Sequence, residues 1–302
     1  MADSRRGFLL GAAAYMIWGL FPLYFPLLEP ADAVEILAHR VFWSLSTMLL
    51  LILVLGRSRR LRAVVKHRRT FGILAVAAVA IAVNWGAYIW GVNNGHVVET
   101  SLGYFINPLV TVLMGVIVLG ERLRNLQWVA LGIAAVAVLG LTVEYGRPPW
   151  VALTLAFSFA FYGLAKKTAN VGAVESLTVE TLLLAPLAAA YIWWLASQGA
   201  STFGTEGPGH AALLVSTGIV TAVPLIFFGA AATRVSMTTI GLLQYLAPTI
   251  QFAIGVLVYQ EDMPVMRWVG FSLVWLALAI FTYEAITHRR RQLRLTAQAS
   301  AL

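Results

Sequence analysis

One sequence motif occurs twice in this chain, with a separation of 140 residues. The first copy contains Pro108, Gly115, Glu121 and Trp128, and the second contains Pro248, Gly255, Glu261 and Trp268. Each copy lies in a long apolar segment that is followed by a short charged break and a further apolar segment. A duplicated apolar unit is how many transporters are built, because two similar halves can move about a site between them. The repeat therefore predicts a membrane protein made of two related halves.

The composition supports a membrane location. Hydrophobic residues make up 60% of the 302 residues and charged residues only 11%, whereas a soluble domain carries about 25% charged residues. The net charge of +8 comes from short Lys and Arg clusters between apolar segments, which indicates cytoplasmic loops rather than a nucleic-acid partner. The chain has no Cys, so disulfides and thiolate metal sites are excluded. We find no residue spacing that indicates a metal ion, a cofactor or an enzyme's nucleophile.

Ten apolar segments follow one another along the chain, and most approach the ~20 residues that cross a bilayer. They cover residues 7–28, 34–55, 71–93, 100–119, 127–143, 150–165, 177–194, 211–232, 240–258 and 265–283. Backbone polar groups must be satisfied inside lipid, so these spans are expected to be helices. The predicted fold class is an all-α integral membrane protein with ten transmembrane helices.

The distribution of basic residues predicts the direction of the spans. Eighteen of the 21 Lys and Arg residues fall at alternate breaks and at the two ends of the chain, which places both termini in the cytoplasm of a bacterial cell. Each half has five spans, an odd number, so the second half is inverted relative to the first. The expected units are a first repeat over 1–146, a second repeat over 147–288 and a basic cytoplasmic tail over 289–302. The segment 196–210, rich in Gly, is expected to be a flexible external link.

Polar side chains form stripes on several predicted helices. Steps of three and four residues place them on one helix face, and each of Pro108 and Pro248 frees a backbone carbonyl and is expected to kink its helix. The functional hypothesis is a substrate-facing wall of a central cavity, and the alternative is hydrogen bonding between neighbouring helices. The stripe residues assigned to substrate binding are Asn84, Tyr88, Tyr104, Asn107, Gln244 and Gln251.

Arg40 is the remaining positive charge and lies inside a predicted span, about 9 Å from the external end of its helix. It shares a face with Trp43, and a guanidinium beside an aromatic ring suits a carboxylate or phosphate of a substrate. The alternative is a structural ion pair or a bond to helix-end carbonyls. Glu35 and His39 are four residues apart and are also able to pair.

No Asp or Glu lies near the middle of a predicted span, and Glu144 and Glu180 are both near span ends. Proton-driven carriers often use carboxylates inside the membrane. If this chain is coupled to protons, the candidates are Glu35, His39 and Glu99. Uncoupled transport stays open as an alternative.

Two stretches carry a family resemblance. Residues 84–109, with Asn93-Asn94-Gly95-His96 and Tyr104-Phe105-Ile106-Asn107-Pro108, resemble the RarD family of EamA-type transporters in the drug/metabolite transporter superfamily. The stretch from Glu35 to Arg40, followed by Trp43-Ser44, resembles it too. The resemblance covers essentially the full chain. It implies a ten-helix inverted repeat in a bacterial inner membrane that exports small metabolites or drugs, without defining the substrate or an accepted list of binding residues.

The main hypothesis is therefore a secondary transporter, not an enzyme, whose partners are a small-molecule substrate and the lipid bilayer. A second hypothesis is a membrane enzyme with a polar site on the external side, formed by Glu35, His39, Arg40, His96 and Glu99. A third is a channel-like facilitator. The sequence leaves the driving ion, the direction of transport and the oligomeric state open.

Overall fold

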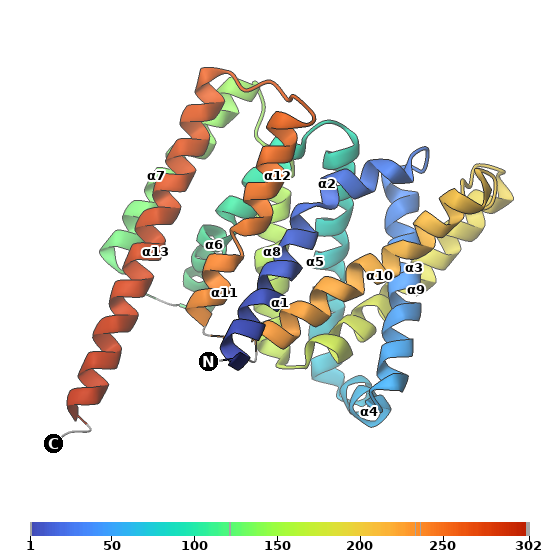
Figure 1. The fold of residues 1–302 in the computed structure, drawn as a ribbon, viewed down its shortest axis with the longest axis horizontal. Helices are drawn as coiled ribbons and strands as arrows, with labels where there is room; N and C mark the ends of the chain where they lie inside the picture. The colour runs from blue at the N-terminus through green and yellow to red at the C-terminus, as the bar shows by residue number, and fades with distance from the viewer. Residues whose placement is uncertain (1, 121, 233, 236, 300–302) are drawn as a thin grey trace.

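The computed structural model describes residues 2–120, 122–232, 234–235 and 237–299, and these form helices and loops without a strand. Most of the helices stand side by side and are joined by short loops (Figure 1). Their bounds are α1 Ala2–Gly19, α2 Phe21–Tyr24, η1 Phe25–Leu28, α3 Ala33–Val54, α4 Ser58–Lys66, α5 Arg68–Asn93, α6 Val97–Leu119, α7 Asn125–Tyr145, α8 Trp150–Ala169, α9 Ala173–Ser197, α10 Gly207–Ala232, α11 Met237–Leu243, α12 Leu246–Leu257 and α13 Val265–Ala299.

The all-helical, membrane-type fold agrees with the sequence. Within the described residues, seven helices are long and apolar enough to cross a bilayer, or eight if the bent pair of α1 with α2 and η1 is one span. Two of the ten expected segments do not meet that standard. Helix α8 carries Lys166 and Lys167 in its last turn, and the ninth segment is divided into α11 and the 12-residue α12. The count of ten spans therefore stays a prediction.

The first helix bends by 44° where α1 ends. Pro22 and Pro26 open α2 and η1, and a proline leaves the carbonyl four residues before it without its helical partner. Both of these carbonyls accept hydrogen bonds from the second half of the chain. Gln251 Nε2 donates to the Trp18 carbonyl at 3.0 Å, and the Tyr259 hydroxyl donates to the Pro22 carbonyl at 2.7 Å. The bend in the first half is thus held by side chains at and just beyond α12.

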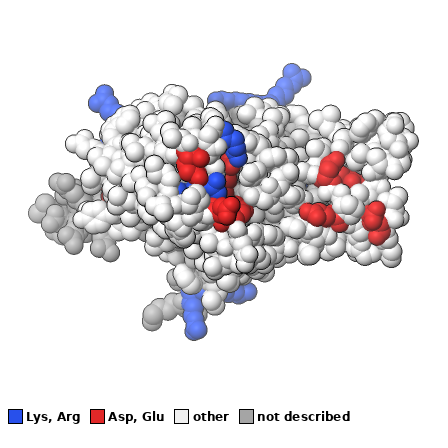
Figure 2. All heavy atoms as spheres, turned by 90° about the horizontal axis from the view of Figure 1, so that it is seen from above, with Lys and Arg blue, Asp and Glu red and all other residues white. Residues whose placement is uncertain are grey.

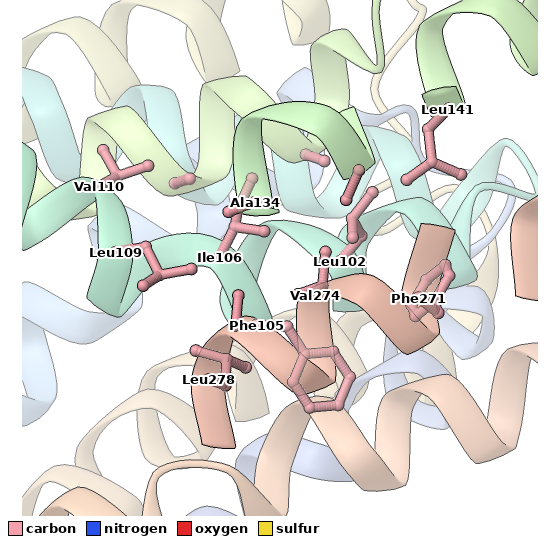
Figure 3. Packing of buried hydrophobic residues seen from close by; sticks show 14 of the residues in the cluster. Leu102, Phe105, Ile106, Leu109, Val110, Ala134, Leu141, Phe271, Val274 and Leu278 are labelled. Atoms are coloured by element: carbon pink, nitrogen blue, oxygen red, sulfur yellow. The ribbon is translucent and has the colours of Figure 1, made fainter. Parts of the chain in front are cut away.

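A large apolar core surrounds α6, which packs between α7, α8, α12 and α13. Figure 3 shows Leu102, Phe105 and Leu109 of α6 beside Phe271 and Leu278 of α13. Small residues of α7 and α8 complete this core, namely Ala130, Ala134, Ala137, Ala152, Ala156 and Ala160. Small side chains allow helices to approach closely in a membrane.

Consecutive long helices run in opposite directions, so that the loops gather at two ends. In Figure 1 the α5–α6, α7–α8 and α12–α13 connections lie at the upper end, and α4 lies at the lower end. Ion pairs tie the lower end together, with Arg57 contacting Glu175 at 3.5 Å and Arg124 contacting Glu284. The Glu121 carboxylate of the first motif copy lies outside the described residues. The lower end contains the basic segment of α4, as the charge pattern predicts.

Candidate functional site

Arg40 is buried in the interior of the bundle, with 5% of its surface exposed. It lies on α3, which begins at Ala33 because Asp32 caps the amides of Val34 and Glu35 at 2.8 and 2.7 Å. The Arg40 Nε donates to the Thr221 hydroxyl of α10 at 3.0 Å. Within the described residues, no carboxylate pairs with Arg40 and its two terminal nitrogens have no hydrogen bond.

Aromatic rings surround the Arg40 guanidinium. Its central carbon lies 4.1 Å from the ring centre of Trp85 on α5, 5.4 Å from that of Phe25 and 5.5 Å from that of Phe21. Such cation–π contacts stabilise a desolvated cation by about 2 kcal/mol or more, and they offset part of the several kcal/mol that burial of an unpaired charge costs. The two structural roles that the sequence offers for Arg40, a carboxylate pair or helix-end carbonyls, do not occur among the described contacts.

Tyr88 continues the aromatic wall around Arg40. Its ring lies 5.9 Å from Phe25 and 5.7 Å from Tyr104, and its hydroxyl is buried without a hydrogen-bond partner in the described structure. A buried hydroxyl without a partner is unusual, because its desolvation costs free energy that no bond returns. We therefore name the Arg40 guanidinium with Trp85, Phe25, Phe21 and Tyr88 the Arg40 centre.

Three of the predicted site residues bind neighbouring helices instead. Asn84 Nδ2 donates to the Leu155 carbonyl at 3.0 Å and to the Ser158 hydroxyl at 3.1 Å, and Asn84 Oδ1 accepts from the Tyr104 hydroxyl at 3.2 Å. Asn107 Nδ2 donates to the Ala156 carbonyl at 3.0 Å. These contacts join α5 and α6 to α8, which is the packing alternative for those stripes.

The second stripe is also partly used in packing. Gln251 is buried, and its Nε2 binds the Trp18 carbonyl while its Oε1 has no described partner. Gln244 is half-buried at the break between α11 and α12. Pro108 lies inside the continuous helix α6, whereas Pro248 lies in the first turn of α12 just after that break. The kink expected at both prolines takes the form of a helix break in the second copy only.

The pairing of Glu35 with His39 is not what the structure shows. The Glu35 carboxylate accepts from the Ser201 hydroxyl at 3.0 Å and the Thr202 amide at 2.8 Å. His39 accepts a hydrogen bond from the Trp43 indole at 3.2 Å, and its ring stacks on Phe203 at 4.9 Å. Side chains of α3 thus bind the segment 196–210, which the sequence predicts to be a flexible external link. The sequence did not indicate that Ser201 and Phe203 anchor this loop, because the Gly residues around them favour a flexible segment.

Carboxylates join the loops at the upper end. Acidic side chains form two groups on this face, one of them mixed with basic side chains (Figure 2). Glu99 pairs with Arg147 at 2.9 Å and accepts from the Val151 amide, in the first turn of α8, at 2.9 Å. Glu144 pairs with Arg267 at 2.9 Å. The partners of Glu99 therefore differ from those of Glu35. The five residues of the enzyme hypothesis do not share one hydrogen-bonded cluster in the described structure.

Glu261 of the second motif copy caps the start of α6. Its carboxylate accepts from the backbone amides of Val97 and Val98, the latter at 3.1 Å. Its own amide donates to the Gly255 carbonyl at 3.0 Å, and a side chain at Gly255 would collide with Val98. Burial raises the pKa of the Glu261 carboxyl to about 7, although the two amides and Arg267 act in the opposite direction. Gly255 and Glu261 of the second motif copy thus fix α12 against the beginning of α6.

Glu180 is the charged residue whose importance the sequence did not indicate. It is fully buried on α9. Its carboxylate accepts from Lys166 of α8 at 2.9 Å, from the Tyr162 hydroxyl at 3.1 Å and from the Ser176 hydroxyl at 2.6 Å. The sequence offered one signal for this network: Lys166 and Glu180 lie near the ends of neighbouring predicted spans.

Two hollows lie on the outer surface of the bundle. One of about 550 Å³ is lined by Val76, Val79 and Phe161, and one of about 230 Å³ by Val34, Leu187 and Tyr191. Several of these side chains are exposed and apolar, as lipid-facing grooves would be. Among the described residues, no group of His, Asp and Glu is arranged to hold a metal ion.

Known proteins resemble this chain over nearly its whole length. The EamA-like transporter family model matches residues 5–143. Protein RarD of Streptomyces exfoliatus is 57% identical over 298 residues, which cover 98% of this chain and 95% of that protein. Protein RarD of Escherichia coli is 44% identical, with 96% and 98% covered, and the chloramphenicol-sensitive protein RarD of Pseudomonas aeruginosa is 32% identical, with 97% and 99% covered.

A solved crystal structure is also similar to the structure of this chain. It has a TM-score of 0.59 and 17% sequence identity, and the match covers 91% of this chain and 96% of that one. At this identity the likeness concerns the fold alone. The apolar helices and the matching relatives together define a multi-pass membrane transporter. The chain belongs to the RarD family of EamA-like transporters.

Proposed function

We propose that this protein is a secondary transporter of the bacterial inner membrane that exports small amphipathic metabolites or drugs. It works by alternating access, with ten spans in two inverted five-helix repeats and both termini in the cytoplasm. The substrate class that the site favours is a compound with a carboxylate or another anionic group, such as an amino acid or a related metabolite. The substrate meets the Arg40 centre between the halves.

The observation that carries the proposal is the state of Arg40. A guanidinium that is buried without a carboxylate partner is costly in a membrane protein, and such residues generally mark a ligand pathway. Its two terminal nitrogens have no described hydrogen bond, so they can donate in parallel to a planar anionic group. The Thr221 bond and the ring of Trp85 hold the guanidinium in place before the substrate arrives.

Counterflow in proteoliposomes tests the transport function. Vesicles that contain the purified chain are loaded with an unlabelled compound, and uptake of the same labelled compound is followed. The panel consists of amino acids, organic acids and chloramphenicol, the last because one relative is described as chloramphenicol-sensitive. Trans-stimulated uptake of at least one compound supports a carrier. Uptake without trans-stimulation supports a channel, and chemical change of the compound supports an enzyme.

Cysteine labelling tests the proposed orientation. Ser201 is buried and bound to Glu35, so the exposed Glu206 is the better site on the α9–α10 loop. In this cysteine-free chain, Glu206→Cys should react with an impermeant maleimide added to intact spheroplasts, whereas Ser58→Cys should react only after lysis. The reverse pattern would overturn the orientation while leaving the transport proposal intact.

A further inference from the structure

Helices α3 and α9 begin with the same sequence pattern. Residues 33–37 read Ala-Val-Glu-Ile-Leu and residues 173–177 read Ala-Val-Glu-Ser-Leu, and each stretch starts at the first residue of its helix. The separation is 140 residues, the same as that between the two copies of the proline motif. Position 40 in the first half therefore corresponds to position 180 in the second half.

The two corresponding positions hold opposite charges. Arg40 is 5% exposed and Glu180 is fully buried. Helices α3 and α9 pack against each other, and they are antiparallel, because Arg57 beyond the end of α3 pairs with Glu175 at the start of α9. Each charge is seven residues into its helix, which is roughly 10 Å from the helix start. Arg40 and Glu180 thus lie toward opposite ends of one helix pair.

The surroundings of the two charges differ. Arg40 has no described carboxylate partner, whereas Glu180 accepts from Lys166, Tyr162 and Ser176. Both Lys166 and Tyr162 come from α8, so the network crosses between two helices. A buried ion pair inside a membrane protein does little for stability relative to apolar residues, and a functional role is the usual reason for its presence.

We propose that Glu180 is the proton-binding carboxylate that couples transport to the proton gradient, and that Lys166 is the cation that replaces the proton. The inference rests on the proposed transport function. When Lys166 of α8 is in contact with Glu180, as at the 2.9 Å of the structure, it neutralises the ionised carboxylate. When the two helices separate, the carboxylate loses its cation and takes a proton from water, because a buried carboxylate without a partner is more stable when neutral. Return of Lys166 releases that proton to water, and Lys166 itself stays charged throughout.

Helix α8 is suited to link the two sites. It holds Lys166 and Tyr162 against Glu180 at one end. Farther along, its Leu155 and Ala156 carbonyls accept hydrogen bonds from Asn84 of α5 and Asn107 of α6. Since α5 also carries Trp85 of the Arg40 centre, a shift of α8 relative to α9 changes both regions together.

The other charged groups near Glu180 have partners or are exposed. On α9 itself, Glu175 pairs with Arg57. The ionisable side chains of α3 are Glu35, His39 and Arg40, toward the opposite end, and α10 has His210 in its first turn at that end. The basic residues of α4 and of the first turn of α5 are exposed, namely Arg59, Arg60, Arg62, Lys66, Arg68 and Arg69. Lys167, the next residue of α8, is exposed, and among the described residues Lys166 is the cation in contact with Glu180.

The earlier candidates for proton coupling are less suitable. Glu35 holds the α9–α10 loop, and Glu99 caps α8 and pairs with Arg147, whose side chain is 35% exposed. Both therefore have structural partners near a loop face. Glu180 combines full burial, a position inside a helix and a cation on a different helix.

Infrared difference spectroscopy of the purified full chain in lipid tests the inference with the proton itself as the probe. All variants in this measurement carry Glu261→Gln, because the Glu261 carboxyl also titrates near pH 7. Between about pH 5 and about pH 9, this background should show the carbonyl band of a buried carboxylic acid, and adding Glu180→Gln should remove it. Glu175→Gln is the matched control on the same helix and should keep the band. Because Glu180→Gln leaves Lys166 unpaired, the double variant Lys166→Gln with Glu180→Gln is measured as well and should also lack the band.

Transport of the labelled panel compound that shows the strongest counterflow, measured in proteoliposomes with an imposed pH gradient, gives a second measurement. Glu180→Gln should keep counterflow, since exchange moves no net proton. The factor by which the pH gradient accelerates transport should be at least tenfold smaller in Glu180→Gln than in the wild type. A band that persists in Glu180→Gln, or gradient acceleration that persists in it, would overturn the inference. If no panel compound shows counterflow in the wild type, the proposed function fails, and the infrared measurement still decides whether Glu180 binds the proton.

Discussion

The two copies of the proline motif fold differently. In the first copy, α6 continues from Val97 to Leu119 through Pro108. In the second copy, the equivalent stretch divides into α11, which ends at Leu243, and α12, which begins at Leu246. The same spacing of Pro, Gly, Glu and Trp is therefore compatible with both a continuous and a broken helix.

Side chains near each proline explain the difference. In the turn before Pro108, the Tyr104 hydroxyl donates to Asn84 and the Asn107 amide donates to the Ala156 carbonyl of α8. The positions 140 residues later are Gln244 and Ala247, and an alanine has no amide group to bind a neighbouring helix. The bond of the second copy to α1, from Gln251 to the Trp18 carbonyl, comes only after its proline.

The close helix contacts also differ between the copies. Gly103 of α6 lies so near α8 that a Cβ there would be 2.7 Å from the Ala152 carbonyl oxygen. The equivalent residue in the second copy is Leu243, and there the small residue is Gly11 of α1, whose added Cβ would be 2.8 Å from the Leu243 side chain. The comparison indicates that α6 is fixed to α8 over its length, whereas the α11–α12 break is the more adaptable element and suits a hinge.

The largest expected effect is on the contact of α6 with α8. Gly103→Ala should lower the free energy of unfolding by roughly 2 kcal/mol, because the added methyl group meets backbone atoms of Ala152 that cannot move easily. Thermal melts of the purified protein measure this. Gly140→Ala on α7 is the matched control, since its added Cβ has no neighbour within 4 Å, and it should be neutral or slightly stabilising. Equal melting temperatures for the two variants would remove the basis of the comparison.

An intermediate effect is expected at Asn107. Asn107→Leu removes the hydrogen bond to the Ala156 carbonyl and should lower the free energy of unfolding by about 1 kcal/mol. Thr111→Val, at an exposed position one turn farther along the same helix, should change stability less. If Asn107→Leu melts like the wild type but transports more slowly, Asn107 faces the substrate, as the polar stripe predicts from sequence alone.

A smaller effect is expected from Glu261. Burial raises the pKa of this carboxyl from 4.5 to about 7, so the folded protein keeps a proton that the unfolded chain has released. The resulting stabilisation is fully present below about pH 4.5 and is lost as pH rises through about 7. Because Glu261 is partly exposed, we expect a decrease of only a few degrees in melting temperature between about pH 6 and about pH 8.

Two variants isolate the contribution of Glu261 to that pH dependence. Glu261→Gln should reduce the slope of melting temperature against pH, since an amide can still accept from Val98 but does not titrate. Asp262→Asn, at the exposed neighbour, should leave the slope unchanged. An identical slope in Glu261→Gln and the wild type would show that this carboxyl does not control the pH dependence.

Periodic features were predictable from the sequence, and contacts between distant residues were not. Apolar length predicted the long helices such as α3 and α10, because each can be recognised from its own residues. The partner of Glu35 was not predictable, since Ser201 is 166 residues away. The same limit applies to Glu180, whose span-end position in the sequence gave no sign of full burial.

The polar stripes show a related limit. Periodicity placed Asn84 and Asn107 on inward helix faces, and both bind α8. However, a period cannot distinguish a residue that binds a substrate from one that binds a neighbouring helix. Arg40 differs, because a charge in an apolar segment by itself marks a residue as a candidate for substrate binding. In the structure its guanidinium lies among aromatic rings.

The central claim is that Arg40 recognises an anionic group of the transported compound. The most direct test measures the concentration dependence of uptake and the thermal melt on the same preparations of Arg40→Lys and Arg40→Gln. Arg40→Lys should weaken the apparent affinity and Arg40→Gln should weaken it further, by roughly 10- to 100-fold, through loss of charge-assisted hydrogen bonds. The melting temperature should stay the same or rise, because no described carboxylate loses a partner. A lower melting temperature in Arg40→Gln, with unchanged affinity in the folded fraction, would contradict the account.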